Sequence, residues 1–69
     1  MSQDVREKIS ANIKKLREGQ GLKREELSLI LGFDNSYISK LEKCKVNITI
    51  DKIAQIADYF KIPASKLLS

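Results

Sequence analysis

The segment from Gly21 to Lys45 constrains the fold of this 69-residue chain more than any other part of it. Two short amphipathic stretches lie in this segment, separated by the tripeptide GFD at residues 32–34. A glycine followed by a residue that caps helices well is typical of a tight turn between two helices. Ser28, a small residue inside the first stretch, allows a second helix to pack closely against it. The segment therefore predicts two short helices that cross at a steep angle.

The composition limits the functions that are open to such a chain. Its residues are expected to form one domain, 1–69. Its net charge of +4 is expected of a protein that binds nucleic acids, although many unrelated small domains are equally basic. With no His and one Cys, it cannot supply the four ligands of a zinc finger or a catalytic imidazole. Its carboxylates are scattered among Lys and Arg residues, without a nucleophile or a metal cluster. We therefore expect no enzymatic activity, no metal and no cofactor.

The same composition favours a cytoplasmic protein. A single cysteine cannot form an intramolecular disulfide. No apolar run approaches the roughly 20 residues that a membrane helix requires, and the first residues lack the apolar core of a signal peptide. We expect neither a membrane partner nor a small-molecule ligand.

Hydrophobic periodicity predicts an all-α fold of five helices. The first helix is expected at roughly residues 4–18, because apolar residues recur there at i, i+4, i+8 and i+11 before the glycines at positions 19 and 21. The fourth helix is expected at roughly Ile50–Phe60, and Pro63 fits the first turn of a short last helix. The stripe on the first helix consists of Val5, Ile9, Ile13 and Leu16.

The three central helices share a start signal, in which an apolar residue before the N-cap pairs with the fourth helical residue. This pattern places N-caps at Lys23, Asp34 and Thr49. Asp and Thr side chains accept hydrogen bonds from free helix amides, whereas Lys cannot and costs about 1 kcal/mol relative to Ser or Thr. The helix-turn-helix core is therefore expected at about residues 23–43.

With these elements in place, the chain resembles the Cro/C1-type (XRE-like) helix-turn-helix family of phage and bacterial repressors. The resemblance covers roughly residues 9–68 and rests on the segments NIKKLREGQGL, REELSLILGFDNSYISKLE and IDKIAQIADYFKIPASKLL. It implies a compact five-helix, lambda-repressor-like domain that regulates transcription by binding DNA. The segment VNITI lacks the proline that is common in the family, and it is more similar to the controller proteins of restriction–modification systems.

By this resemblance, the start of the third helix faces the base edges of double-stranded DNA in the major groove. Asn forms two hydrogen bonds with adenine, Lys donates to guanine, and Ser is compatible with several bases. The alternative for Lys40 is a solvated surface lysine, and the alternative for Tyr37 is a half-buried packing residue. The expected base-reading residues are Asn35, Ser36, Tyr37, Ser39 and Lys40.

The resemblance also implies phosphate contacts from the start of the second helix and from the loop after the third. Arg24 occupies a position where the family usually has a phosphate-binding Gln, and Arg adds charge to that contact. The alternative is a run of charges on a solvated face. The expected phosphate-binding residues are Lys23, Arg24, Lys43, Lys45 and Asn47.

Two further positions stand out against the family pattern. Glu42 would repel phosphate, and the resemblance implies that it forms a structural ion pair with Arg17 in the first helix. Cys44 stands where the family often has Gly in a left-handed conformation, which costs a non-Gly residue on the order of 1 kcal/mol. The turn at Cys44 is therefore expected to differ, and a redox role for its thiol is an alternative interpretation.

Repressors of this type usually act as dimers on near-palindromic sites, with two recognition helices about 34 Å apart. We expect the dimerisation region at about residues 48–69, where apolar groups exceed what a small core needs. The competing hypothesis is an antitoxin-like protein–protein interaction module without sequence preference. The expected interface residues are Ile50, Tyr59, Ile62, Leu67 and Leu68.

Overall fold

A computed structural model describes the backbone of residues 3–69 and the side chains of residues 5–69, so positions 1 and 2 of the expected domain lie outside the described residues. The described chain is all-helical, which confirms the predicted five-helix fold. The helices are α1 (Gln3–Gly19), α2 (Arg24–Ile30), α3 (Tyr37–Glu42), α4 (Ile50–Phe60) and α5 (Ser65–Leu68).

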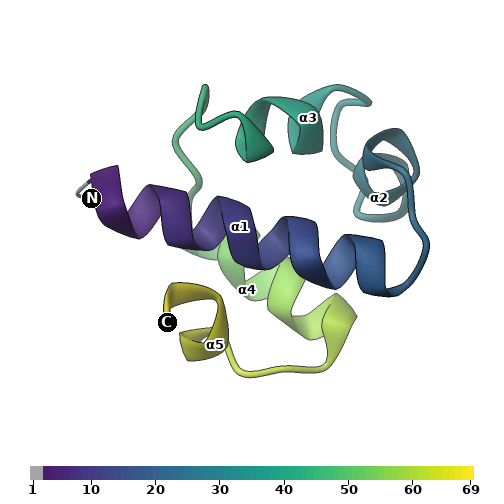
Figure 1. The fold of residues 1–69 in the computed structure, drawn as a ribbon. Helices are drawn as coiled ribbons and strands as arrows, with labels where there is room; N and C mark the ends of the chain where they lie inside the picture. Colours follow the sequence, from purple (N-terminus) through teal and green to yellow (C-terminus); the bar gives the residue numbers. More distant parts are fainter. Residues whose placement is uncertain (1–2) are drawn as a thin grey trace.

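The longest helix, α1, lies at the centre of the arrangement (Figure 1). It contacts α3 on one side and α5 on another, while α2 packs against α3 and α4 against α5. In the view of Figure 1, α2 and α3 lie above α1, and α4 and α5 lie below it. The helix-turn-helix pair and the C-terminal helices therefore occupy different sides of α1.

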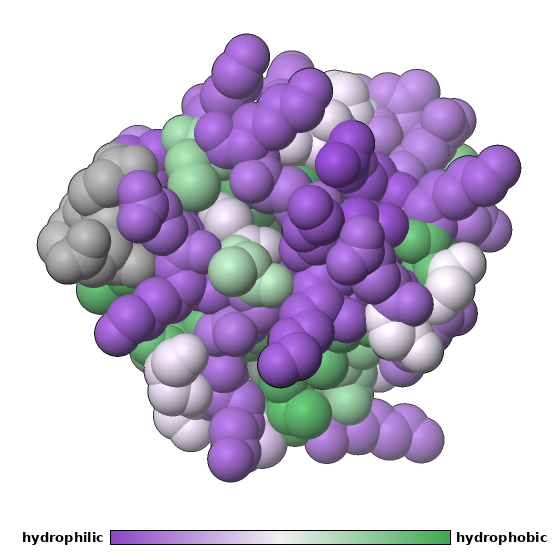
Figure 2. Space-filling model, in the orientation of Figure 1, coloured by the Kyte–Doolittle hydropathy of each residue, from purple (hydrophilic) through white to green (hydrophobic). Residues whose placement is uncertain are grey.

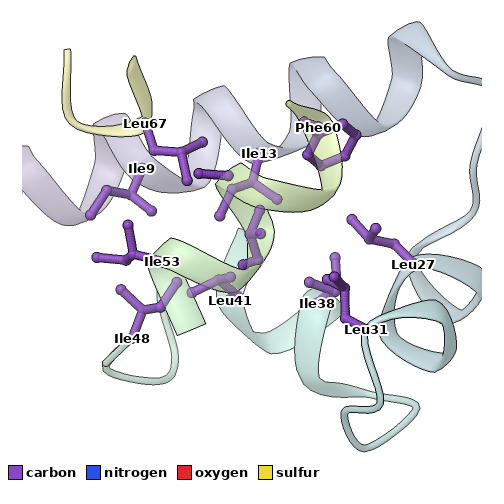
Figure 3. Packing of buried hydrophobic residues seen from close by; sticks show 12 residues of the cluster. Ile9, Ile13, Leu27, Leu31, Ile38, Leu41, Ile48, Ile53, Phe60 and Leu67 are labelled. Atoms are coloured by element: carbon purple, nitrogen blue, oxygen red, sulfur yellow. The ribbon is translucent and has the colours of Figure 1, made fainter. Parts of the chain in front are cut away.

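Every helix contributes a fully buried aliphatic side chain to one common core. In Figure 3, the labelled side chains of this core point toward one another between the helices. Burial of a Leu or Ile side chain contributes about 1.5–3 kcal/mol, so the core rather than helix propensity holds helices as short as α3 and α5. The five side chains are Ile13, Leu27, Ile38, Ile56 and Leu67, each with no exposed surface.

The ends of the first four helices share one geometry. In each, the first or second residue after the helix adopts a left-handed conformation with φ between 58° and 75°. The amide that follows then donates to a carbonyl five residues earlier, at N···O distances of 2.8–3.1 Å. This is the Schellman arrangement, for which glycine is preferred because it lacks a Cβ. The four left-handed residues are Gly21, Gly32, Cys44 and Lys61.

The start of α3 differs from the prediction, whereas the starts of α2 and α4 agree with it. Thr49 caps α4 by accepting a hydrogen bond from the Lys52 amide at 3.2 Å. Lys23 is the N-cap of α2. The N-cap of α3 is Ser36, two residues after the predicted cap at Asp34. The physical reason is a local competitor, since the Asp34 carboxylate binds the Ser36 hydroxyl at 2.7 Å within a turn that precedes the helix.

Lys61 gives the first testable prediction. The free energy of unfolding of the Lys61→Gly variant is expected to be about 0.5–1 kcal/mol higher than that of the Lys61→Ala variant. Both variants lack the lysine side chain, but glycine relieves a left-handed strain of about 1–2 kcal/mol and adds only about 0.5–1 kcal/mol of unfolded-chain entropy. Urea denaturation followed by circular dichroism measures the difference. Equal stability of the two variants would contradict strain at this helix end.

Candidate nucleic-acid interface

Three buried polar side chains hold the inner side of α3. The Ser10 hydroxyl of α1 donates to the Leu41 carbonyl at 2.7 Å. The Ser28 hydroxyl of α2 accepts a hydrogen bond from the Ile38 amide at 3.1 Å. The third is Arg17 of α1, which binds Glu42. Ser10, Arg17 and Ser28 are the buried polar residues of the described chain, and each of them binds a group of α3.

Ser28 lies where α2 packs against α3. Its side chain has no exposed surface, and its hydroxyl also donates to the Arg24 carbonyl at 3.0 Å, one turn earlier in α2. Both the donor and an acceptor site of this hydroxyl are therefore used. A larger residue would separate the helices, and an apolar one would leave the Ile38 amide unpaired inside the protein.

The Glu42 carboxylate joins three helices. It lies at the last turn of α3 with 3% of its side chain exposed. Arg17 Nε donates to Glu42 Oε2 at 2.7 Å, and Arg24 Nε donates to Glu42 Oε1 at 3.1 Å. The hydrogen bond to Glu42 raises the pKa of Arg17 above its ordinary value. Arg17 and Glu42 thus form the ion pair that the resemblance implies, and Arg24 extends it toward the surface.

The opposite edge of α3 is polar and faces outward. Asn35 and Lys40 are exposed, and Ser36 and Ser39 are half-buried. The Lys40 amide donates to the Ser36 carbonyl at 3.0 Å, so these two residues lie one helical turn apart on the same face. The structure therefore brings four of the five predicted base-reading residues to one surface, at the start of α3.

Tyr37 is the exception, and the structure gives it a packing role. Its hydroxyl oxygen is buried and has no hydrogen-bond partner among the described residues, and this burial raises the pKa of the phenol. Its ring packs edge-on against Phe33 at a centroid distance of 5.0 Å, and Lys52 Nζ lies 4.3 Å from the ring centroid. A buried hydroxyl cannot reach a base edge, which removes Tyr37 from the predicted base readers.

Cationic and polar side chains flank this edge on both sides. On the α2 side, Lys23 is exposed, and the Arg24 side chain is 45% exposed although its Nε binds Glu42. On the other side, the loop after α3 exposes Lys43, Lys45 and Asn47. All five predicted phosphate-binding residues are therefore accessible, with Arg24 beside Glu42 in the last turn of α3 and three of the others in the loop that follows it.

The turn at Cys44 keeps the left-handed conformation, with a φ of 58°, despite the absence of glycine. Arg6 Nη2 donates to the Cys44 carbonyl at 3.1 Å, and the Cys44 thiol lies 3.3 Å from the Ser10 hydroxyl. These contacts stabilise a left-handed conformation that glycine would adopt without strain. The prediction that this turn differs from the left-handed family pattern is therefore wrong. Arg6 and Ser10 share a face of α1 with Arg17, and this i, i+4, i+11 spacing was the available sequence signal for their role.

The predicted dimer residues divide into surface and core. Ile50 and Leu68 are 83% and 43% exposed, and Tyr59 and Ile62 are half-buried against the core. In Figure 2, hydrophilic residues cover most of the face in front of α1, and hydrophobic surface lies at its lower edge, over the α4–α5 connection.

Leu67 is a correction to this set. It is fully buried in its own chain, so it cannot contribute to a dimer surface. The reason is the docking of α5 on α1, where Asn12 Nδ2 donates to the Leu67 carbonyl at 2.9 Å. Two exposed apolar residues that the sequence analysis did not single out, Leu29 and Ile30, lie on α2.

Residues 5–69 bring together no cluster of His, Cys, Asp or Glu that could hold a metal ion. The described helices include none that is long and apolar enough to span a membrane.

The network around Glu42 predicts an asymmetry between its two arginines. Arg17→Ala is expected to lower the free energy of unfolding by about 3–5 kcal/mol, because it leaves a buried carboxylate without its main partner. Arg24→Ala breaks an ion pair of the same carboxylate at the exposed side and is expected to cost less than about 1 kcal/mol. Urea denaturation of the two variants checks this. Similar decreases in the two variants would contradict the central role of the buried pair.

Comparisons with known proteins agree with this geometry. A helix-turn-helix family model matches residues 13–67. A hypothetical transcription factor of Neisseria meningitidis serogroup B is 32% identical over 66 residues, which cover 96% of this chain and 62% of that protein, so the chain spans less than two thirds of its length. The crystal structure of the hypothetical Neisseria transcription factor NHTF has a TM-score of 0.91 at 31% identity, over 97% of this chain and 77% of that one.

Two similar proteins are control proteins. Control protein C.SmaI of Serratia marcescens is 27% identical over 96% of this chain and 79% of its own length. The crystal structure of the restriction–modification controller protein C.AhdI of Aeromonas hydrophila has a TM-score of 0.81 at 27% identity, over 90% of this chain and 94% of that one. The family match and these relatives agree with the α2–α3 helix pair that the structure shows. The chain therefore belongs to the Cro/C1-type helix-turn-helix family of DNA-binding transcription regulators.

Proposed function

We propose that this chain reads a specific double-stranded DNA sequence as a homodimer on a near-palindromic operator, in the role of a restriction–modification controller protein. The observation that carries the proposal is the outward edge of α3. Asn35, Ser36, Ser39 and Lys40 lie there together, while buried ties from α1 and α2 fix the inner side of the same helix.

In this proposal, α3 enters the major groove with its first turn toward the base edges. Asn35 suits adenine, because its amide both donates to and accepts from that base, and Lys40 suits the two acceptors of guanine. Lys23 and Arg24 on one side, and Lys43, Lys45 and Asn47 on the other, would bind phosphates and fix the register of α3 in the groove. Only Nε of Arg24 is needed for the Glu42 pair, so its terminal nitrogens remain available for a phosphate.

A dimer is supported by the position of the remaining apolar surface. Ile50, Tyr59, Ile62 and Leu68 belong to α4, α5 and their connection, below α1 in Figure 1, whereas α3 lies above it. The chain measures 27 × 24 × 20 Å, so two copies packed through these helices can hold two α3 helices about 34 Å apart. The controller role is supported by the similarity to C.SmaI and C.AhdI and by the proline-free segment VNITI at residues 46–50.

Selection of bound duplexes from a random DNA pool at physiological salt tests the proposal. We expect enrichment of a near-palindrome whose half-sites lie about one helical turn apart, because a two-fold dimer presents two identical recognition helices. Retention of DNA without enrichment, or no retention, would refute sequence-specific reading and favour the interaction-module hypothesis.

Arg24 yields a separate prediction about phosphate binding. Arg24→Ala is expected to weaken binding to all duplexes alike and to reduce the slope of log affinity against log salt by about 0.9 for each phosphate that the arginine neutralises. The matched control is Lys66→Ala, which removes a positive charge from exposed α5 on the other side of α1. Fluorescence anisotropy over a range of salt concentrations measures both slopes. Equal slopes for the two variants would place Arg24 outside the DNA interface.

A further inference from the structure

The Ser36 hydroxyl at the start of α3 uses its proton in a hydrogen bond within the chain. It donates to Asp34 Oδ2 at an O···O distance of 2.7 Å, a short distance that is typical of a hydrogen bond to an ionised acceptor. A serine hydroxyl has one hydrogen to donate and two lone pairs that accept. With its proton held by Asp34, Ser36 can offer only lone pairs to any third group.

The carboxylate that holds this proton is itself ionised. The Ser36 hydroxyl lowers the pKa of Asp34 below its ordinary value, and the Ser36 amide, the charge of Lys40 and the Asn35 amide contribute in the same direction. At neutral pH, Asp34 therefore carries no proton of its own and acts only as an acceptor.

This pair lies on the edge that faces outward. Ser36 and Lys40 are one helical turn apart on the same face of α3. Asp34 is exposed, and the charge of Lys40 helps to lower the pKa of its carboxyl group. The edge therefore has a defined pattern of hydrogen-bonding groups. The Asp34–Ser36 pair offers only acceptors from its side chains, and one turn later Lys40 offers only donors.

We propose that Asp34 is a specificity-determining residue, which holds the Ser36 proton and thereby makes Ser36 select a base with a donor in the major groove, adenine or cytosine. This inference rests on the proposed function of α3 and adds a base class to it. A free serine accepts either polarity, because its hydroxyl can rotate. A serine fixed in this way rejects guanine and thymine at that point, since their O6, N7 and O4 atoms are acceptors.

The geometry also sets the spacing of the expected half-site. One helical turn advances about 5.4 Å, and consecutive base pairs are about 3.4 Å apart. The base read by Ser36 should therefore lie about one or two base pairs from a guanine read by Lys40. The half-site is expected to combine an adenine or cytosine with that guanine.

The test compares base preferences in selections from a random duplex pool at one salt concentration. The chain itself is expected to prefer adenine or cytosine over guanine and thymine at one base pair by at least about fivefold. Asp34→Ala is expected to remove this preference, because the Ser36 hydroxyl becomes free to donate. Ser36→Ala is expected to remove it as well, because the reading group is gone, and this serine side chain makes no cap hydrogen bond that the fold of α3 would need.

Two matched variants separate the mechanism from other effects. Asp34→Asn keeps an oxygen that accepts the Ser36 proton, but its amide group can instead donate to the Ser36 oxygen, so it is expected to keep the preference only in part. Lys40→Ala is expected to change the preference at a different base pair and to leave this one intact. Thermal melting of each variant controls for folding, and a structural role alone would not alter the base identity at one position.

The outcomes are distinguishable. If the chain enriches a motif and Asp34→Ala keeps the same preference at every position, the inference is overturned while the proposed function stands. If the chain itself enriches no motif, the proposed function fails and this inference fails with it.

Discussion

The buried carboxylate of Glu42 is the constraint on which the placement of α3 depends. A charge with 3% exposure must be paired, because an unpaired carboxylate in a small core would cost several kcal/mol. Arg17 pairs with it from α1 and Arg24 from α2, so the last turn of α3 cannot move relative to either helix without breaking an ion pair. A helix of six residues has little stability of its own, and this link gives it a fixed position.

The same logic extends along the inner side of α3. Ser10 holds the carbonyl of Leu41, and Ser28 holds the amide of Ile38. These two hydrogen bonds and the ion pair satisfy the Leu41 carbonyl, the Ile38 amide and the Glu42 carboxylate, and they leave the outer edge free for a partner. Rigid support beneath an exposed polar edge is what a reader of base edges requires, because misplacement by about 1 Å would weaken several hydrogen bonds at once.

The outer edge is itself organised by short-range contacts. Asp34 accepts the proton of the Ser36 hydroxyl, and the charge of Lys40 helps to lower its pKa, so contacts within the chain set the polarity of this surface. Such preorganisation reduces the ordering cost of binding. It also makes the turn before α3 part of the surface that DNA would meet, although the aspartate there first suggests only a helix cap.

Local patterns in the sequence were sufficient to predict the five helices. Apolar spacing identifies the buried face of a helix, and glycines and cap residues mark its ends within a few positions, as at Gly21 and Thr49. The resemblance to a known family supplied the pairing of Arg17 with Glu42, across 25 positions. Competition between two local hydrogen-bonding patterns shifted the start of α3 to Ser36, because Asp34 binds the serine side chain in the preceding turn.

Only the tertiary structure decided which apolar and polar groups remain at the surface. Leu67 and Leu68 are equivalent in the sequence, yet the docking of α5 on α1 buries the first completely and leaves the second 43% exposed. Tyr37 lies among polar residues in the sequence, yet its ring packs against Phe33 and Lys52 and its hydroxyl oxygen is buried. Periodicity determined the helices and their apolar faces, because it reflects contacts within a few residues. Exposure depends on which distant element covers each face, and that follows only when all five helices pack together.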